Sequence, residues 1–275
     1  MAGMPHLVKV QEQYKAQGLI ILASHLQNVP KDEVLALCRK NKVNYTVVNG
    51  GRLSGDDSPG LPHAWLLDGT GKVVKDGHVE ELKQELEATL AREAHWIARG
   101  KKLEAKSALQ ISEGLKAGKS FGWALGECEA LAKKNDEKAK AEAEYLRDQI
   151  VVEGERVLAE AGVAEEKDPV HALELYDEAR AGWKKHEIEK KADARVKELK
   201  KDKAFQKELE AAKLAGQLRE LAGQLVSKDG KYDLAGPQNQ QTAAQIRGGL
   251  KQLKAKHAET KIGQACVDEL KAFGF

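Results

Sequence analysis

The sequence changes character near Leu90. Before that residue, short apolar runs rich in β-branched side chains alternate with segments of helical periodicity, as in a mixed α/β domain. After it, alanine, lysine, glutamate and leucine dominate and strand patterns are almost absent, which is typical of helices. At 275 residues the chain is long enough for two domains. We therefore expect an α/β domain at residues 1–90 and an all-α region at residues 91–275.

The expected order of elements in the first region is helix, strand, helix, extended segment, β-hairpin and helix. Apolar side chains spaced i, i+3 and i+7 line one face of the first helix, Pro5–Tyr14, and Gly18 ends it. The run Leu19–Ala23 is apolar throughout, as in a strand covered on both faces. The later elements are a helix opened by Pro30, an extended piece at Tyr45–Val48, a hairpin of Ala64–Leu67 with Lys72–Lys75, and a helix bearing Leu82, Leu86 and Leu90.

Two prolines make this order similar to that of a known family. Met4-Pro5 lies in the first helix and Leu61-Pro62 directly precedes the hairpin. With these positions, the region resembles the thioredoxin-like fold of envelope thiol–disulfide oxidoreductases and redoxins. The resemblance covers about a third of the chain. It implies dithiol–disulfide exchange, in which an activated thiolate attacks a substrate disulfide.

The redox motif of that family, and the strand that carries it, are missing from this chain. A Cys-x-x-Cys opens the family's first helix, so by resemblance its second cysteine would fall immediately before Met1. The same strand lies in the middle of the family's sheet, between the strands that match Leu19–Ala23 and Ala64–Leu67. Without it, both strands would present unpaired backbone groups and could close up, dimerise or aggregate. Either Met1 is an internal methionine of a longer reading frame, or the motif has been lost.

Leu61, Pro62 and His63 form the predicted binding loop for a substrate or peptide. By resemblance, Pro62 matches the family's cis-proline, which lies beside the redox motif and lets neighbouring backbone pair with an extended substrate. An X-Pro bond is also the usual route to a cis peptide, but a plain loop proline before a strand fits the same sequence. His63 and His25 would lie at or near this edge by the family's arrangement. A solvated or hydrogen-bonded loop histidine is the alternative for both.

No catalytic residue can be assigned in the chain as written. Cys38, Cys128 and Cys266 are odd in number, widely spaced and form no Cys-x-x-Cys pair. Cys38 falls on an apolar helix face and Cys266 among apolar neighbours, so both are expected to be core residues. No spacing of His or Cys supports a metal site. Gly50-Gly51 and Gly69-Thr70-Gly71 are typical of turns rather than nucleotide-binding loops, so no cofactor is expected.

The charge balance argues against a dedicated nucleic-acid surface. Basic side chains number 45 and acidic ones 43, for a net charge of +2, and the two signs are mixed along the chain. No run approaches the ~20 apolar residues of a membrane span. Met1–Lys15 lacks the apolar centre of a signal peptide. The sequence as written predicts a cytoplasmic protein, whereas a start further upstream could restore an export signal and place it in the envelope.

The second region is expected to contain a long helix followed by two helical hairpins. Gly162 is predicted to end the long helix, and Asp168-Pro169 to begin the next one as N-cap and first residue. Glu187 and Lys191 have the spacing of an i, i+4 ion pair on the solvent side. The apolar stripe of the long helix consists of Leu146, Ile150, Val157 and Ala161.

A weak internal repeat connects the two hairpins. Five residues between Ala194 and Lys200 recur 71 positions later, and each copy follows an amphipathic segment, Pro169–Trp183 or Thr242–Leu253. The pattern is similar to tetratricopeptide-type hairpins, although the signature is incomplete and ~3 stacked units are normally needed. A small helical bundle is the alternative, and Ser227–Asn239 is the expected loop between the copies.

Two classes of function remain open from the sequence. The first is a binding or structural protein, in which a thioredoxin-like module without redox activity is joined to a helical region that contacts a protein partner. The second is a fragment of an active envelope thiol–disulfide oxidoreductase, with a protein thiol or disulfide as its substrate. An in-frame Cys-x-x-Cys upstream of the Met1 codon would favour the second class.

Overall fold

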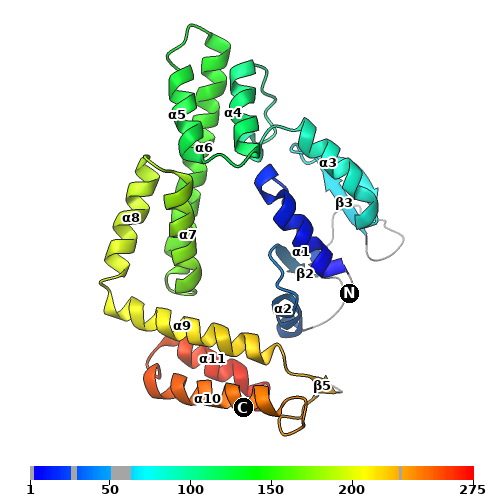
Figure 1. Cartoon of the computed structure of the whole chain (residues 1–275), viewed down its shortest axis with the longest axis vertical. Coiled ribbons are helices and arrows are strands. Elements are labelled where there is room, and N and C mark those ends of the chain that lie inside the picture. The colour runs from blue at the N-terminus through cyan, green and yellow to red at the C-terminus, as the bar shows by residue number, and fades with distance from the viewer. Residues whose placement is uncertain (1–2, 26–29, 51–62, 229–230) are drawn as a thin grey trace. The chain divides into compact units, whose positions relative to one another are not determined.

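The computed structural model describes residues 3–25, 30–50, 63–228 and 231–275. Helices dominate these residues, and three two-stranded sheets accompany them (Figure 1). The chain divides into two compact units, each built from several segments. The first contains Met1–Lys31, Val43–Gly154 and Gly182–His186, and the second contains Asp32–Lys42, Glu155–Ala181 and Glu187–Phe275. The domain boundary predicted at residue 90 stays a prediction.

Two of the sheets lie in the first unit, close to the predicted strand positions, although the strand expected at Leu19–Ala23 is found at Leu22–His25. Strand β1 (Leu22–His25) pairs in parallel with β2 (Thr46–Asn49). Strand β3 (Ala64–Leu67) pairs antiparallel with β4 (Val73–Gly77), as expected for the hairpin. Its turn is closed by Asp68, whose side chain accepts hydrogen bonds from the backbone N–H groups of Thr70 and Lys72.

The β3–β4 hairpin packs against two helices. Helix α1 (Gly3–Tyr14) contributes Tyr14, and α3 (Lys83–Arg92) contributes Leu86, to a cluster that also contains Leu66 of β3. Gly18 adopts φ +104 after the 3-10 turn η1 (Lys15–Gln17), where a side chain would be strained and its Cβ would lie 2.9 Å from Trp96. The turn after α1 therefore requires glycine, as the sequence predicted.

The remainder of the first unit is helical. It consists of two 3-10 turns and three helices: η2 (Val79–Leu82), η3 (Trp96–Ala98), α4 (Lys106–Lys116), α5 (Phe121–Leu131) and α6 (Glu137–Ala164), the last of which continues into the second unit. Ala105 stands at the N-cap of α4 and has no side chain able to cap it. The buried carboxylate of Glu142, on α6, accepts from the backbone N–H groups of Glu104 and Ala105 at 3.0–3.1 Å. Glu142 thus binds the backbone immediately before α4 from a distant part of the chain, where its negative charge also lies close to the positive end of that helix.

Trp183 belongs to an aromatic cluster of the first unit in which Phe121 is the central ring. The side chain of Trp183 is 1% exposed, and its indole N–H donates to the carbonyl oxygen of Ile150 at 3.0 Å. The ring of Phe121 stacks on it with centroids 4.6 Å apart, and Trp96 meets Phe121 edge to face. This cluster packs the start of α5 against the segment Gly182–His186.

Both predicted helical hairpins are present in the second unit. The first consists of α7 (Pro169–Gly182) and α8 (Glu187–Leu199), and the second of α10 (Gln240–Lys256) and α11 (Lys261–Lys271). Helix α9 (Lys203–Ala222) packs against both helices of the second hairpin around a shared core. Most of α2 (Lys31–Lys40) also belongs to this unit. Whether the two hairpins are related as repeats stays a prediction.

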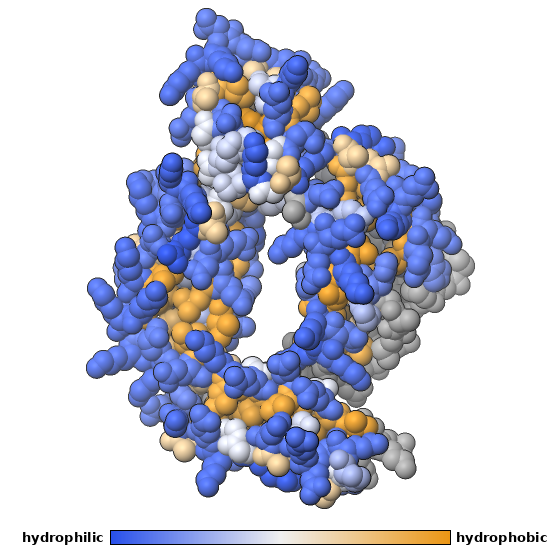
Figure 2. Space-filling model, viewed as in Figure 1, coloured by the Kyte–Doolittle hydropathy of each residue, from blue (hydrophilic) through white to orange (hydrophobic). Residues whose placement is uncertain are grey.

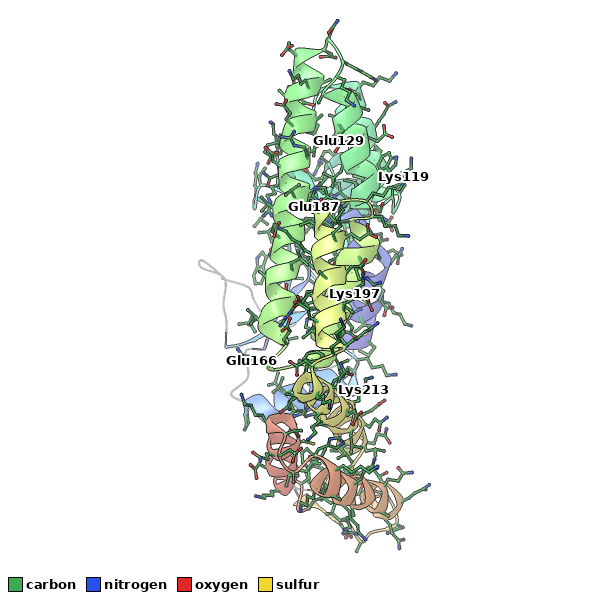
Figure 3. The ribbon with its side chains drawn as sticks, turned by 90° about the vertical axis from the view of Figure 1, so that its left-hand side faces the viewer. Lys119, Glu129, Glu166, Glu187, Lys197 and Lys213 are labelled. Carbon is green, nitrogen blue, oxygen red and sulfur yellow. The ribbon has the colours of Figure 1, made fainter. Side chains whose placement is uncertain are left out.

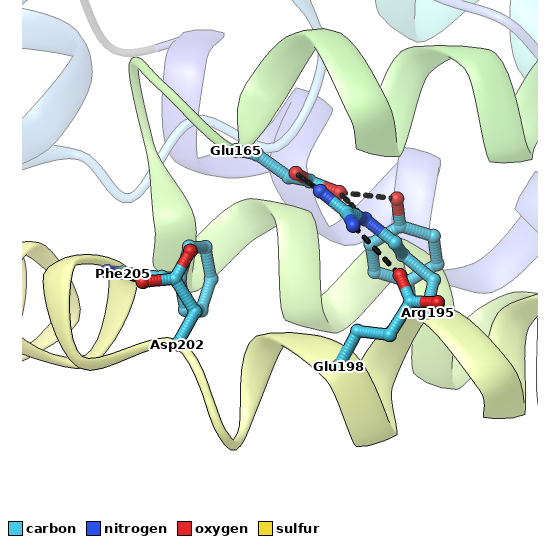
Figure 4. A network of polar contacts seen from close by, with 6 residues as sticks. Glu165, Arg195, Glu198, Asp202 and Phe205 are labelled. Carbon is cyan, nitrogen blue, oxygen red and sulfur yellow. Dashed lines mark hydrogen bonds and ion pairs between the residues drawn. The ribbon is translucent and has the colours of Figure 1, made fainter.

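A polar network joins the end of α6 to the first hairpin (Figure 4). The guanidinium of Arg195 binds both carboxylate oxygens of Glu165, at 2.9 and 2.6 Å, and also contacts Glu198 at 2.8 Å. The buried Tyr176 donates its hydroxyl hydrogen to Glu165 at 2.7 Å. The Arg195 guanidinium lowers the pKa of Glu165, and burial raises the pKa of Tyr176. Through Arg195 and Tyr176, Glu165 connects the end of α6 to both α7 and α8.

Replacing Glu165 by glutamine should lower the free energy of unfolding by about 1 kcal/mol at pH 7, because Arg195 is partly exposed and the pair is screened by water. The pKa of Glu165 is depressed in the folded chain, so its contribution is complete above the ordinary value of about 4.3 and is lost as the pH falls through the lowered value. Urea unfolding of the unmodified chain and of Glu165→Gln, measured from pH 7 to acid pH, should show that the difference between their free energies of unfolding becomes smaller. Glu166→Gln, at the exposed neighbour, is the control.

Three local predictions were wrong. Helix α6 continues past Gly162 to Ala164, whose carbonyl oxygen then accepts from the backbone N–H of Asp168. Glu187 pairs with Lys190 rather than with Lys191, which instead reaches Glu155 on α6. The segment predicted as a plain loop contains a small antiparallel pair, β5 (Ser227–Lys228) with β6 (Lys231–Tyr232).

Candidate functional site

The candidate site consists of the two strand edges in the first unit. Among the residues that the structure describes, β1 is paired only with β2, and β3 only with β4. Each of these strands therefore has one edge without a described strand partner. Backbone N–H and C=O groups along such an edge can pair with another extended chain.

One face of the β1–β2 pair is apolar and open. Leu22 is 71% exposed and Val48 is 46% exposed, and the parallel register Leu22↔Thr46 and Ser24↔Val48 places both on the same face. Ile20, just before the strand, is 72% exposed. The expectation that this strand is covered on both faces was therefore wrong. Most of the surface seen in Figure 2 is hydrophilic, with hydrophobic side chains in separate patches.

His63 lies beside the hairpin and is held there by neighbours. Its Nε2 is 3.2 Å from a carboxylate oxygen of Asp76 on β4, and its ring meets that of Trp65 edge to face at 4.7 Å. The side chain is 12% exposed, as in the hydrogen-bonded loop histidine given as the alternative. Leu61 and Pro62 lie outside the described residues. The backbone of His25 lies in β1, and its side chain also falls outside the description.

The hairpin presents a second apolar position next to its turn. Leu67 and Val73 pair across β3 and β4 and are 43% and 48% exposed. Leu66, on the opposite face, is buried in the cluster with α1 and α3. The hairpin thus has one face in the core and one face available to a partner.

The three cysteines are free thiols that favour the protonated form. Cys128 and Cys266 are buried, as predicted for Cys266, and Cys38 is partly buried. Burial raises the pKa of the Cys128 thiol to about 11 and also raises the pKa of Cys38 and Cys266. Because the thiolate is the nucleophile in disulfide exchange, these groups are poorly suited to that reaction near neutral pH.

Within the described ranges, no group of three or more His, Cys, Asp or Glu side chains is arranged to hold a metal ion. No helix in the described part of the chain is long and apolar enough to cross a membrane. No family model, curated protein or solved structure matches this chain.

Proposed function

We propose that residues 1–90 form a thioredoxin-like module that binds an extended segment of a partner protein and is inactive in disulfide exchange. The helical region then serves as a further binding or structural part of the same protein. The observation that carries the proposal is the edge of β1 and of β3 that has no strand partner among the described residues. A segment added to such an edge gains main-chain hydrogen bonds from the strand, and its alternate side chains meet the exposed face.

Two further features support this proposal. Leu22 and Val48 offer an apolar face to the alternate side chains of an added strand, beside the edge of β1. The cysteines offer no thiolate near this edge, since Cys128 keeps a pKa of about 11 and the other two are also raised. Binding therefore agrees better with the described residues than redox turnover does.

Leu22→Lys should weaken the binding of a short alternating Val-Thr peptide by at least about tenfold, or about 1.4 kcal/mol. A lysine on an edge strand discourages pairing because its charge must remain in water. Since Leu22 is already 71% exposed, the substitution should leave the core intact. Fluorescence anisotropy of a labelled peptide with the full chain measures the change.

Val152→Lys is the matched control, because Val152 is 53% exposed on α6 of the same unit and far from any strand in sequence. It should bind the peptide as the unmodified chain does. A second peptide has proline in place of alternate threonines. Because proline has no backbone N–H to donate to the strand edge, this peptide should bind poorly. Equal binding of both peptides, or equal loss in both variants, would contradict the proposal.

The alternative is an active thiol–disulfide oxidoreductase, and insulin reduction with dithiothreitol separates it from the binding module. The binding module predicts no acceleration over the uncatalysed reaction. Acceleration that is abolished by removing Cys38 would favour the alternative, because Cys38 is the least buried of the three thiols.

A further inference from the structure

A groove on the second unit is formed by one face of α10 and the last residues of the chain. Its volume is about 570 Å³. Arg247, Lys251 and Lys254 line it, and Leu250, Ala255 and Phe275 supply its apolar part. Leu250 is buried and Phe275 packs against the core shared by α9, α10 and α11, so the apolar part belongs to a well-supported surface.

The second half of helix α10 is basic and carries no acidic residue. Between Asp233 and Glu259 the sequence contains no acidic residue, although the chain as a whole is nearly balanced in charge. The three cations of the groove follow at i, i+4 and i+7, which places them on one face of the helix. Lys254 lies in the last turn of α10, where it also complements the negative end of the helix dipole.

These three cations have no acidic partner within the described part of the chain. Within the described residues, no ion pair is formed by Arg247, Lys251 or Lys254, and the Arg247 guanidinium lies over the ring of Phe275, 5.9 Å from its centre. Other basic side chains of the same unit are paired, for example Lys190 with Glu187 and Lys271 with Asp268. Like charges at i, i+4 destabilise a helix slightly. An acidic partner placed in the groove would offset that repulsion.

We infer that this groove binds an acidic segment of a partner protein that carries one aliphatic or aromatic anchor side chain. The carboxylates of the segment pair with the three cations, and the anchor rests on Leu250 and Phe275. The combination of the apolar part of the groove with its three cations fits such a segment better than it fits a nucleic acid. A nucleic-acid groove would offer several aromatic rings for stacking, whereas this groove has only Phe275. The inference does not depend on the strand edges of the first unit.

The test uses the full chain and a labelled peptide of alternating Asp and Glu with a central leucine. Replacing Arg247, Lys251 and Lys254 together by glutamine should weaken its binding by at least about tenfold, since each partly exposed pair contributes modestly. Increasing salt should weaken binding to the unmodified chain and have less effect on the variant. Anisotropy titrations at two salt concentrations measure both changes.

The control removes three charges elsewhere in the same unit. Lys197 on α8 and Lys213 on α9 project from the surface in Figure 3, and Lys200 is also exposed. Their joint replacement by glutamine changes the net charge equally and should alter binding less than about twofold. An equal loss of peptide affinity in both triple variants would show that overall charge alone causes the effect, and would overturn the inference.

Two further outcomes decide between kinds of ligand. A peptide with serine in place of the central leucine should bind several-fold more weakly, and equal binding would contradict the anchor. A single-stranded oligonucleotide of the same charge should bind less tightly than the leucine peptide, and tighter binding would assign the groove to nucleic acid instead. If the triple variant unfolds at a lower temperature than the unmodified chain, Lys251→Gln alone should still measurably weaken the binding of the leucine peptide.

Discussion

Trp183→Ala is expected to lower the free energy of unfolding by about 3–5 kcal/mol, the largest effect of any substitution considered for this chain. The indole is 1% exposed, stacks on Phe121 and donates to the carbonyl oxygen of Ile150. Alanine would leave a cavity where the aromatic cluster meets α6 and would remove the hydrogen bond. Urea unfolding followed by circular dichroism measures the change.

Trp183→Phe separates the two contributions, because phenylalanine fills much of the space but cannot donate to Ile150. Its cost should be about 1–2 kcal/mol. Val152→Ala, at an exposed position of α6, the helix that carries Ile150, should change the free energy of unfolding by less than about 0.5 kcal/mol. A Trp183→Ala protein as stable as the Val152→Ala protein would show that the aromatic cluster is not a core.

Gly122→Ala is expected to destabilise the chain by about 1–3 kcal/mol. A Cβ at Gly122 would lie 2.5 Å from the carbonyl oxygen and 2.9 Å from the backbone nitrogen of Lys184. Because both are backbone atoms, neither can move aside as a flexible side chain could. The start of α5 and the segment after α7 would therefore have to separate.

Gly126→Ala is the matched control in the same helix, since nothing lies within 4 Å of the added Cβ. It should stabilise α5 by about 0.5–1 kcal/mol, because glycine loses more backbone freedom on folding than alanine does. Thermal unfolding of the two variants should therefore move in opposite directions. A similar shift for both would show that Gly122 does not approach Lys184 as described.

Local pattern predicted most of the elements and much of the helical core. The stripe Leu146, Ile150, Val157 and Ala161 is buried along α6, as its helical spacing indicates. Asp168 accepts from the backbone N–H of His171 and begins α7 with Pro169, as its capping chemistry predicts. These features depend on residues within a turn or two of each other, where sequence patterns are informative.

Contacts between residues far apart in sequence could not be predicted in this way. Glu142 binds the backbone immediately before α4 from 37 to 38 residues away, and Arg195 reaches Glu165 across 30 positions. Charged residues are so common in this region that no single pair stands out. Gly162 was misleading because an exposed glycine is tolerated inside a long helix.

The candidate site was predicted in part. Strands at the positions expected to flank a missing neighbour are present, and His63 lies beside the hairpin as expected. Its contact with Asp76 crosses the hairpin and depends on the strand register, which the sequence does not specify. The thioredoxin-like assignment itself stays a proposal. The basic groove was missed, although the absence of acidic residues from Asp233 to Glu259 was visible in the sequence.

Two buried thiols, one in each unit, can report the local unfolding of the helices around them. Cys128 lies in the first unit and Cys266 in the second, at 2% and 0% exposure. An alkylating reagent can modify either one only when the surrounding helices separate, and at reagent concentrations where alkylation is faster than reclosing, the rate of modification equals the rate of that separation. Mass spectrometry of the two labelled peptides over time would therefore give separate opening rates for the two units without any introduced probe.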